Sequence, residues 1–107
     1  MRPIPQKLRK EMSADPYYDI CVRRNDGWCD GRITWEHAII FRGWQLNEKW
    51  AIIPLCEYHH LGDGLDKNKN RMIALNRATN EELKSISQAV DYLQLKIFLN
   101  KKYAKSI

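Results

Sequence analysis

The sequence has no long apolar run, and no stretch approaches the roughly 18 consecutive apolar residues that a membrane-spanning helix needs. Its opening residues, MRPIPQKLRKEM, lack the apolar segment of a secretory signal. Internal repeats and low-complexity linkers are also lacking, so the chain does not divide into repeated units. These absences predict a protein that is not embedded in a membrane, and they make the cytoplasm the expected location.

Cysteine is scarce, since Cys21, Cys29 and Cys56 are the only three. An odd number cannot all pair, and disulfides are rare in cytosolic proteins, so we do not expect a disulfide framework. The chain of 107 residues has room for one domain, 1–107, with a core of modest size. A bound metal ion would help to stabilise so small a domain, and cysteines accompanied by histidines point toward such an ion.

Acidic residues are outnumbered, because 18 Lys and Arg stand against 13 Asp and Glu, a formal net charge of +5. Positive charge suits a polyanionic partner, since each neutralised phosphate releases condensed counterions. Charge alone leaves a nucleic-acid-binding protein and an ordinary basic domain equally favoured. Nothing in the sequence indicates a small-molecule cofactor.

The first third of the chain predicts a short helix followed by a loop. The helix covers residues 6–13 and ends ahead of Pro16, because the residue before a proline is driven out of the α region. Residues 21–31 have the composition of a loop, with a turn signal at 25–27.

Two strands are expected next. The β-branched and aromatic residues at 32–35 predict a strand that leads directly into a Glu-His pair. The apolar residues at 50–53 predict a second strand, bounded by Pro54. With residues 43–49 as the connecting loop, the two strands would pair as a β-hairpin.

The rest of the chain predicts helices, which makes the expected fold class α+β. A short helix follows Cys56 and stops at Gly62 or Gly64, and another covers 66–77. A capping box at 79–82 then begins an amphipathic helix. The apolar residues of this last helix recur at steps of three and four: Leu83, Ile86, Val90, Leu93 and Ile97.

Cys56 and His59 form a C-x2-H pair, and residues three apart on a helix lie on the same face. Cys21 and Cys29 lie on the turn-rich segment, which can fold back toward this pair. Three thiolates and one imidazole complete a tetrahedral Zn²⁺ shell with no open position, the pattern of a structural site. His60 is an alternative fourth ligand, because positions i+3 and i+4 straddle one helix face. The competing interpretation is three free, partly buried thiols.

The remaining histidines predict a second, catalytic site. Phosphodiester hydrolysis needs a base to deprotonate water and a cation to stabilise the phosphorane and the departing oxygen. Histidine suits the first task. We assign Glu36 and His60 to a catalytic Mg²⁺ or similar divalent ion, and His37 to the general base. Adjacent residues of a regular strand face opposite sides, so Glu36 and His37 share a site only where the strand bulges or ends.

Taken in order, the motifs are Cys21-x7-Cys29, then Gly31-Arg32-Ile33-Thr34-Trp35-Glu36-His37, then Pro54-Leu55-Cys56-x2-His59-His60. This set spans residues 21–61 and resembles the HNH endonucleases, most closely their small, phage-type members. The resemblance implies a ββα-metal core with a β-hairpin and a short metal-bearing helix. An N-terminal helix would precede this core and a helical extension over 66–107 would follow it.

The resemblance also implies roles for single residues. The acidic residue before the first histidine and the last histidine of the motif bind the catalytic metal, here Glu36 and His60, and the first histidine, His37, is the base. The family's cysteines hold a zinc, and His59 stands where a second cysteine is usual, which fits a CCCH site. Asn47 would be the asparagine that braces the loop between the strands. The implied activity is metal-dependent cleavage of DNA; the sequence leaves duplex, single-stranded and branched DNA, and also RNA, open as substrates.

Basic side chains flank the two motifs and are candidates for contacts with phosphates. For each one, a solvated charged surface is an equally good interpretation. The candidates are Arg32, Arg42, Lys49, Lys67, Lys69 and Arg71.

Three other functions compete with the nuclease. A non-catalytic zinc module that binds DNA or RNA would need neither the Glu36-His37 pair nor the spare His60. A protein-interaction adaptor would use the C-terminal helix. A zinc-dependent nucleobase deaminase carries H-x-E followed by P-C-x-x-C, whereas here the order is Glu-His and no second cysteine follows Cys56.

Overall fold

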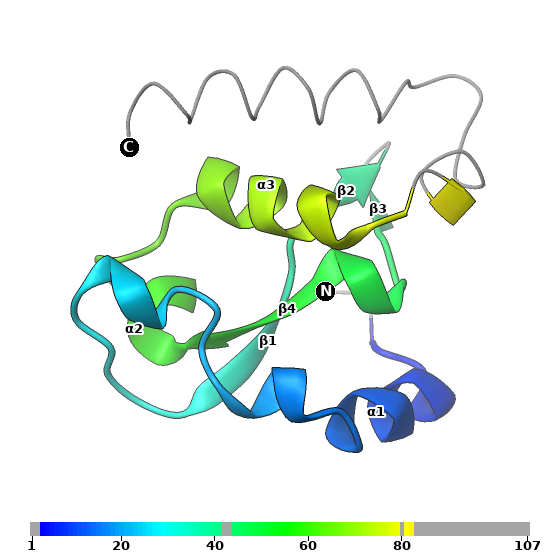
Figure 1. Cartoon of the computed structure of the whole chain (residues 1–107), viewed down its shortest axis with the longest axis horizontal. Coiled ribbons are helices and arrows are strands. Elements are labelled where there is room, and N and C mark those ends of the chain that lie inside the picture. Colours follow the sequence, from blue (N-terminus) through cyan, green and yellow to red (C-terminus); the bar gives the residue numbers. More distant parts are fainter. Residues whose placement is uncertain (1–2, 42–43, 80, 83–107) are drawn as a thin grey trace.

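The centre of the fold is an antiparallel pair of strands. The computed structural model describes residues 3–41, 44–79 and 81–82. Within this part, β1 (Ile33–His37) pairs with β4 (Ile52–Cys56) in a two-stranded sheet. Figure 1 shows the two strands side by side, with α3 (Lys67–Arg77) on one side and α1 (Gln6–Ser13) on the other. The predicted α+β class and the antiparallel pairing are confirmed.

Pro54 lies inside β4, so the prediction that this proline bounds the second strand is wrong. It pairs with Trp35, and its carbonyl oxygen accepts a hydrogen bond from the Val22 amide at 3.0 Å, on the edge away from β1. The amide nitrogen of a strand residue points to the same edge as its carbonyl. The missing N–H of Pro54 therefore removes no hydrogen bond from the β1–β4 ladder.

Strand β4 is buried on both faces. Ile53 and Leu55 belong to the main core, which includes residues of α3. On the opposite face, Ile52 packs with Met12 of α1 and with Tyr18. A strand that is covered on both sides carries a continuous apolar run instead of an alternating one. This double burial explains why the stretch around Pro54 contains no polar residue.

The connection between the two strands is more regular than the open loop expected over 43–49. Strands β2 (Ile40–Phe41) and β3 (Trp44–Gln45) form a second, two-residue ladder. A 3-10 helix, η3 (Lys49–Ala51), then leads into β4. The strand therefore begins at Ile52, and the start expected at residue 50 is wrong. Such short ladders and single turns leave no periodicity that a sequence pattern can reveal.

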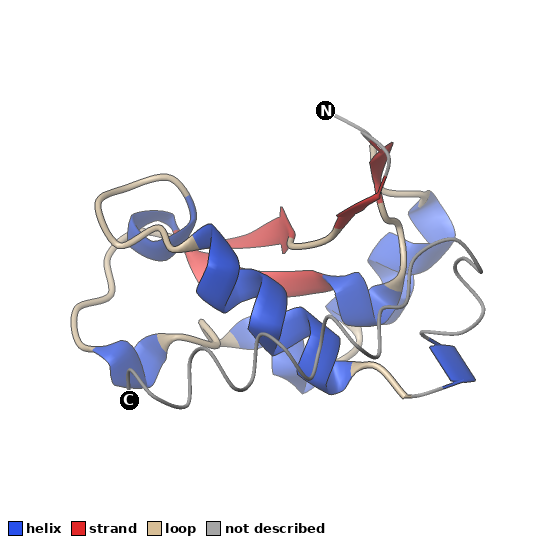
Figure 2. Ribbon diagram, turned by 90° about the horizontal axis from the view of Figure 1, so that it is seen from above, coloured by secondary structure: helices blue, strands red, loops and turns tan. Residues whose placement is uncertain are grey.

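The expected helices are present within the described residues. Helix α1 has the predicted bounds, α2 (Glu57–His60) follows Cys56, and α3 begins one residue later than expected. Asp66 caps α3 by accepting a hydrogen bond from the Lys69 amide at 3.0 Å. Figure 2, seen from above, shows α3 crossing beside the strands. In the described part of the chain, no helix is long and apolar enough to cross a membrane.

Short 3-10 helices occupy the segment between α1 and β1, at η1 (Pro16–Asp19) and η2 (Arg24–Asp26). At the other end of the described chain, the predicted capping box is confirmed. The Glu82 amide donates to Thr79 Oγ1 at 3.1 Å, and the Thr79 amide donates to Glu82 Oε1 at 2.9 Å. The amphipathic helix expected beyond this box lies outside the described residues.

Asn70 is a polar residue in the packed face of α3. Its side chain is 1% exposed, and neither amide atom has a hydrogen-bond partner among the described residues. A buried polar group without a partner costs about 1–3 kcal/mol, and alanine is also the better helix former. We therefore expect Asn70→Ala to raise the free energy of unfolding by about 1 kcal/mol in urea titrations. A loss of stability instead would mean that the amide makes a stabilising contact.

Candidate metal centre and active site

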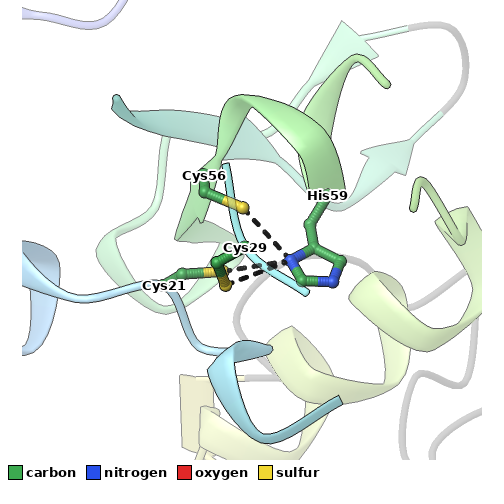
Figure 3. A group of neighbouring side chains, drawn as sticks. All are labelled: Cys21, Cys29, Cys56 and His59. Carbon is green, nitrogen blue, oxygen red and sulfur yellow. Dashed lines mark hydrogen bonds between the residues drawn. The ribbon is translucent and has the colours of Figure 1, made fainter. Parts of the chain in front are cut away.

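Cys21, Cys29, Cys56 and His59 come together as a candidate metal centre. Their ligand atoms all lie within 4.8 Å of one another. The cysteines come from the segment after η1, the loop before β1 and the end of β4, whereas His59 is on α2. Figure 3 shows the three sulfurs converging on Nδ1 of His59. The sequence predicted this set of four residues, and the structure brings them together.

The spacing of these atoms fits zinc. A tetrahedral ion with Zn–S of about 2.3 Å and Zn–N of about 2.1 Å places sulfur and nitrogen roughly 3.6 Å apart. The distances from His59 Nδ1 to Sγ of Cys56, Cys21 and Cys29 are 3.2, 3.5 and 3.7 Å. His60 is not part of the cluster, so the choice that the sequence leaves open between the two histidines falls on His59.

The pKa values of Cys56 and Cys29 are shifted in opposite directions. Burial would raise the pKa of Cys56, but the backbone amides of His59 and Asp30 donate to its sulfur and hold the pKa below its usual value. Burial, together with the neighbouring Cys56 and Cys21 sulfurs, raises the pKa of Cys29 to about 12. Three thiolates side by side repel one another, and a bound cation removes that cost. The cluster is therefore a possible metal site whose ligand set is compatible with zinc.

Two glycines make room around this centre. Gly31 has φ +83°, and a Cβ there would lie 2.7 Å from the Glu57 side chain. A Cβ on Gly64 would lie 2.4 Å from the Tyr58 ring and 2.8 Å from Cδ2 of His59. Both positions therefore need glycine, the first for its backbone conformation and for space, the second for space alone. Because Gly64 has no side chain, the backbone at this residue can lie close to the His59 imidazole.

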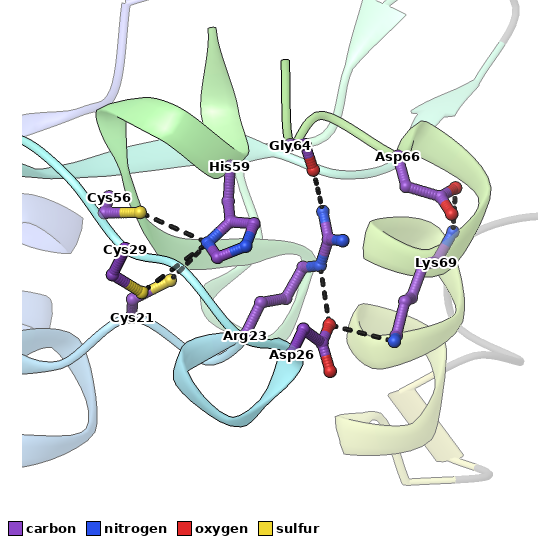
Figure 4. A network of polar contacts seen from close by, with 9 residues as sticks. All are labelled: Cys21, Arg23, Asp26, Cys29, Cys56, His59, Gly64, Asp66 and Lys69. Carbon is purple, nitrogen blue, oxygen red and sulfur yellow. Dashed lines mark hydrogen bonds and ion pairs between the residues drawn. The ribbon is translucent and has the colours of Figure 1, made fainter. Parts of the chain in front are cut away.

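An ionic network links the loop that carries Cys21 and Cys29 to α3, as Figure 4 shows. The buried Arg23 donates through Nε to Asp26 at 2.9 Å and through Nη1 to the Gly64 carbonyl at 2.5 Å. The same Asp26 oxygen pairs with Lys69 Nζ at 2.9 Å. Burial raises the pKa of Asp26, but its hydrogen bonds with Lys69 and Arg23 outweigh this and lower the pKa overall. The cysteine loop is thus attached to α3 independently of any metal.

A second site lies at the free edge of β1, where a cavity of about 250 Å³ is lined by Glu36, His37 and His60 among others. Opposite residues of an antiparallel pair lie on the same face of the sheet. Glu36 is opposite Ile53 and His37 is opposite Ile52, so the two side chains leave the strand on different faces. They reach one cavity because it lies at the edge of β1, where the strand ends. The three candidate residues are therefore brought together.

Thr34 orients His60. The Thr34 hydroxyl lies 2.8 Å from the Leu55 carbonyl and 2.6 Å from His60 Nδ1. A carbonyl only accepts, so the hydroxyl donates to Leu55 and accepts from Nδ1–H of His60. This leaves the lone pair of His60 Nε2 facing Glu36 Oε2, 3.3 Å away. Sequence reasoning missed Thr34, although alternation along a strand places it on the same face as Glu36.

The atoms that Glu36 and His60 turn toward each other, Oε2 and Nε2, are both hydrogen-bond acceptors. Burial raises the pKa of Glu36, an effect that the positive charge of Lys67 opposes. Burial and the neighbouring His37 lower the pKa of His60. Both shifts oppose the charges that an ion pair requires. A carboxylate oxygen and a neutral imidazole nitrogen are metal ligands, and adjacent ligands of an octahedral ion lie about 3 Å apart. The pair therefore has the donor atoms and the spacing for a divalent ion.

Asn47 holds the imidazole of His37. Its Nδ2 donates to the Pro3 carbonyl at 3.0 Å, which turns Oδ1 toward His37 Nε2 at 2.8 Å. Because Oδ1 can only accept, Nε2 carries the proton and Nδ1 is left as the atom that accepts one. His37 is 8% exposed, so the ring is buried in this orientation.

Comparisons of the chain with protein-family models, with curated proteins and with solved structures found no match in any of the three. The chemical roles considered for these residues therefore rest on the sequence motifs and on the geometry of the two sites.

None of the basic candidates within the described residues lines the cavity. Lys49 pairs with Asp15 at 2.9 Å, Arg32 with Glu57 at 3.1 Å, and Lys69 belongs to the network of Figure 4. Lys67 is exposed and close enough to Glu36 to act on its pKa. Arg71 lies on α3, and Arg42 lies outside the described residues. The cavity instead contains Arg9 of α1, for which no local sequence signal exists.

Proposed function

We propose that this protein is a metal-dependent endonuclease that hydrolyses phosphodiester bonds of DNA, similar to the HNH endonucleases with their ββα-metal fold. The convergence of Glu36, His37 and His60 on one cavity carries the proposal. A base and two metal ligands are what the reaction requires, and a protein that only bound DNA would have no use for them. The order β1, β4, α2 provides a hairpin followed by a metal-bearing helix, which is compatible with that fold.

The residues divide the reaction between them. A divalent ion held by Glu36 and His60 would supply the positive charge that stabilises the phosphorane and the departing oxygen. His37 accepts a proton from the attacking water at Nδ1, while Asn47 holds the Nε2–H on the other side of the ring. The water oxygen then forms its bond to phosphorus, and the bond from phosphorus to the leaving oxygen breaks.

In this proposal the zinc is structural. Three thiolates and the His59 imidazole fill a tetrahedral shell, so no position remains for water or substrate. His59 and His60 are neighbours on α2, and neighbouring helical side chains point about 100° apart. Zinc bound to His59 would therefore fix the orientation of α2, so that the His60 imidazole, on a different side of the helix, faces the Glu36 carboxylate.

The proposal is tested by incubating the zinc-loaded protein with duplex, single-stranded and branched DNA in Mg²⁺, Mn²⁺ or EDTA. We expect cutting with the divalent ions and none with EDTA. Glu36→Gln should abolish it, whereas the matched variant Glu57→Gln should cut normally, because Glu57 lies outside the cavity and pairs with Arg32. Tight binding without cutting would instead indicate a zinc-stabilised DNA-binding module, and neither binding nor cutting would favour an adaptor.

Asn47 should behave as a positioning residue. In Asn47→Ala the His37 ring loses the acceptor that fixes its proton on Nε2. Residues that orient active-site groups typically contribute about 10- to 100-fold to activity, so we expect kcat to fall by about tenfold with KM little changed. Steady-state kinetics on a short oligonucleotide would measure this split. An unchanged kcat would show that Asn47 only closes the loop onto Pro3.

A further inference from the structure

A permanent cation that the proposed mechanism does not use lies in the wall of the cavity at the edge of β1. Arg9 of α1 lines this cavity with His37 and Trp35. Of the described residues that line it, Arg9 is the only lysine or arginine. A fixed positive charge beside a base and two metal ligands is where an anionic substrate would be held.

The guanidinium of Arg9 is held on one side and open on the other. Its Nε donates to the Ile4 carbonyl at 3.2 Å, and its Cζ lies 5.9 Å from the centre of the Trp35 ring. Its two terminal nitrogens donate to no described residue. A planar guanidinium with free N–H groups matches the oxygens of a phosphate, which it binds through two parallel hydrogen bonds.

Arg9 lies beside Trp35, the strand residue that precedes the proposed metal ligand Glu36. Trp35 is opposite Pro54, on the face of the sheet that α1 covers, whereas Glu36 is opposite Ile53 on the main-core face. A DNA strand whose scissile phosphate lay at Glu36 can continue across the edge of β1, because the cavity there is lined by residues of both faces of the strand. Its next phosphate would then reach the side of the strand where Arg9 and Trp35 lie.

We propose that Arg9 binds the backbone phosphate next to the scissile one, which makes α1 part of the DNA-binding surface. The inference rests on the proposed function for its substrate class. Because a contact to a neighbouring phosphate is made equally in the ground state and the transition state, its loss raises KM and leaves kcat unchanged. The loss also lowers by one the number of neutralised phosphates, so the affinity for DNA falls less steeply as the salt concentration rises.

The test measures binding of a fluorescent duplex oligonucleotide to the zinc-loaded protein without Mg²⁺, over a series of salt concentrations. The variants are Arg9→Ala, Arg9→Lys and the matched control Lys10→Ala, which removes the same charge from the next, exposed position of α1. In Arg9→Ala the slope of log K against log salt should be smaller in magnitude by about 0.9. Arg9→Lys and Lys10→Ala should keep the wild-type slope, since lysine still neutralises a phosphate and Lys10 lies outside the cavity.

Cleavage of the same oligonucleotide with Mg²⁺ separates this inference from the proposed function. With Arg9→Ala we expect KM to rise about tenfold, the usual cost of a lost charged hydrogen bond, and kcat to stay within about twofold. Wild-type protein that binds but does not cut would refute the nuclease, and the slope alone would then decide the role of Arg9. Equal slopes for wild type and Arg9→Ala, an equal loss in Lys10→Ala, or no DNA binding at all would overturn the assignment of Arg9.

Discussion

Replacing His37 by alanine is expected to lower kcat for Mg²⁺-dependent DNA cleavage by about 10²- to 10⁴-fold, the contribution of a positioned general base. His37 lies in the cavity with Glu36 and His60, and Asn47 directs its Nδ1 to accept a proton. Removing the imidazole leaves the proposed metal ligands Glu36 and His60 in place but takes away the group that we propose deprotonates water. Single-turnover cleavage of an oligonucleotide by wild type and His37→Ala measures the difference.

Two controls separate loss of the base from loss of the fold. His37→Ala should keep its zinc content, because His37 does not belong to the cysteine cluster. Added imidazole should restore part of the cleavage by occupying the space that the side chain left. A variant that cuts DNA at the wild-type rate would remove His37 from the mechanism. A variant that neither holds zinc nor responds to imidazole would show that His37 is needed for folding instead.

Replacing Cys56 by serine is expected to release zinc and to lower the melting temperature by more than about 10 °C. Structural zinc binds zinc-finger peptides with about 10–16 kcal/mol, which matches or exceeds the whole stability of a typical small domain. Cys56 is 2% exposed, and its sulfur lies 3.2 Å from His59 Nδ1 at the junction of β4 and α2. Metal analysis of the purified variant and a thermal melt measure both effects.

The two neighbouring histidines of α2 provide a matched control for this prediction. His59→Ala should lose zinc and stability like Cys56→Ser, whereas His60→Ala should keep both and lose only DNA cleavage. The substitutions are identical and lie one residue apart, so helix propensity does not explain a difference. Wild-type protein purified without zinc, or a Cys56→Ser variant as stable as wild type, would mean that the three cysteines are free thiols that bind no metal.

Sequence predicted what depends on short-range spacing. The C-x2-H spacing brings Cys56 and His59 together at the start of a short helix, and the helix expected over 66–77 is α3, which begins one residue later. The Glu-His pair was predicted as a shared site only where a strand ends, and β1 does end at His37. These features follow from backbone periodicity and from the preferences of single residues.

Other features depend on contacts between distant parts of the chain, which no local pattern encodes. Pro54 is tolerated inside β4 because its nitrogen, which carries no proton, faces the edge away from β1, the same edge at which Val22 donates to its carbonyl. The tautomer of His60 follows from Thr34 and Leu55, and that of His37 follows from Asn47 and the Pro3 carbonyl, 44 residues away. No local sequence spacing relates these partners, because only the folded chain brings them together.

The position of the proposed catalytic ion is the most direct test of the proposed active site. Crystals of the zinc-loaded protein soaked in Mn²⁺ distinguish the two metals by their anomalous scattering at the zinc and manganese edges. We predict a zinc peak within the cluster of Cys21, Cys29, Cys56 and His59, and a separate manganese peak between Glu36 Oε2 and His60 Nε2. A zinc peak alone, with no manganese bound by Glu36 and His60 at saturating Mn²⁺, would contradict the proposed active site.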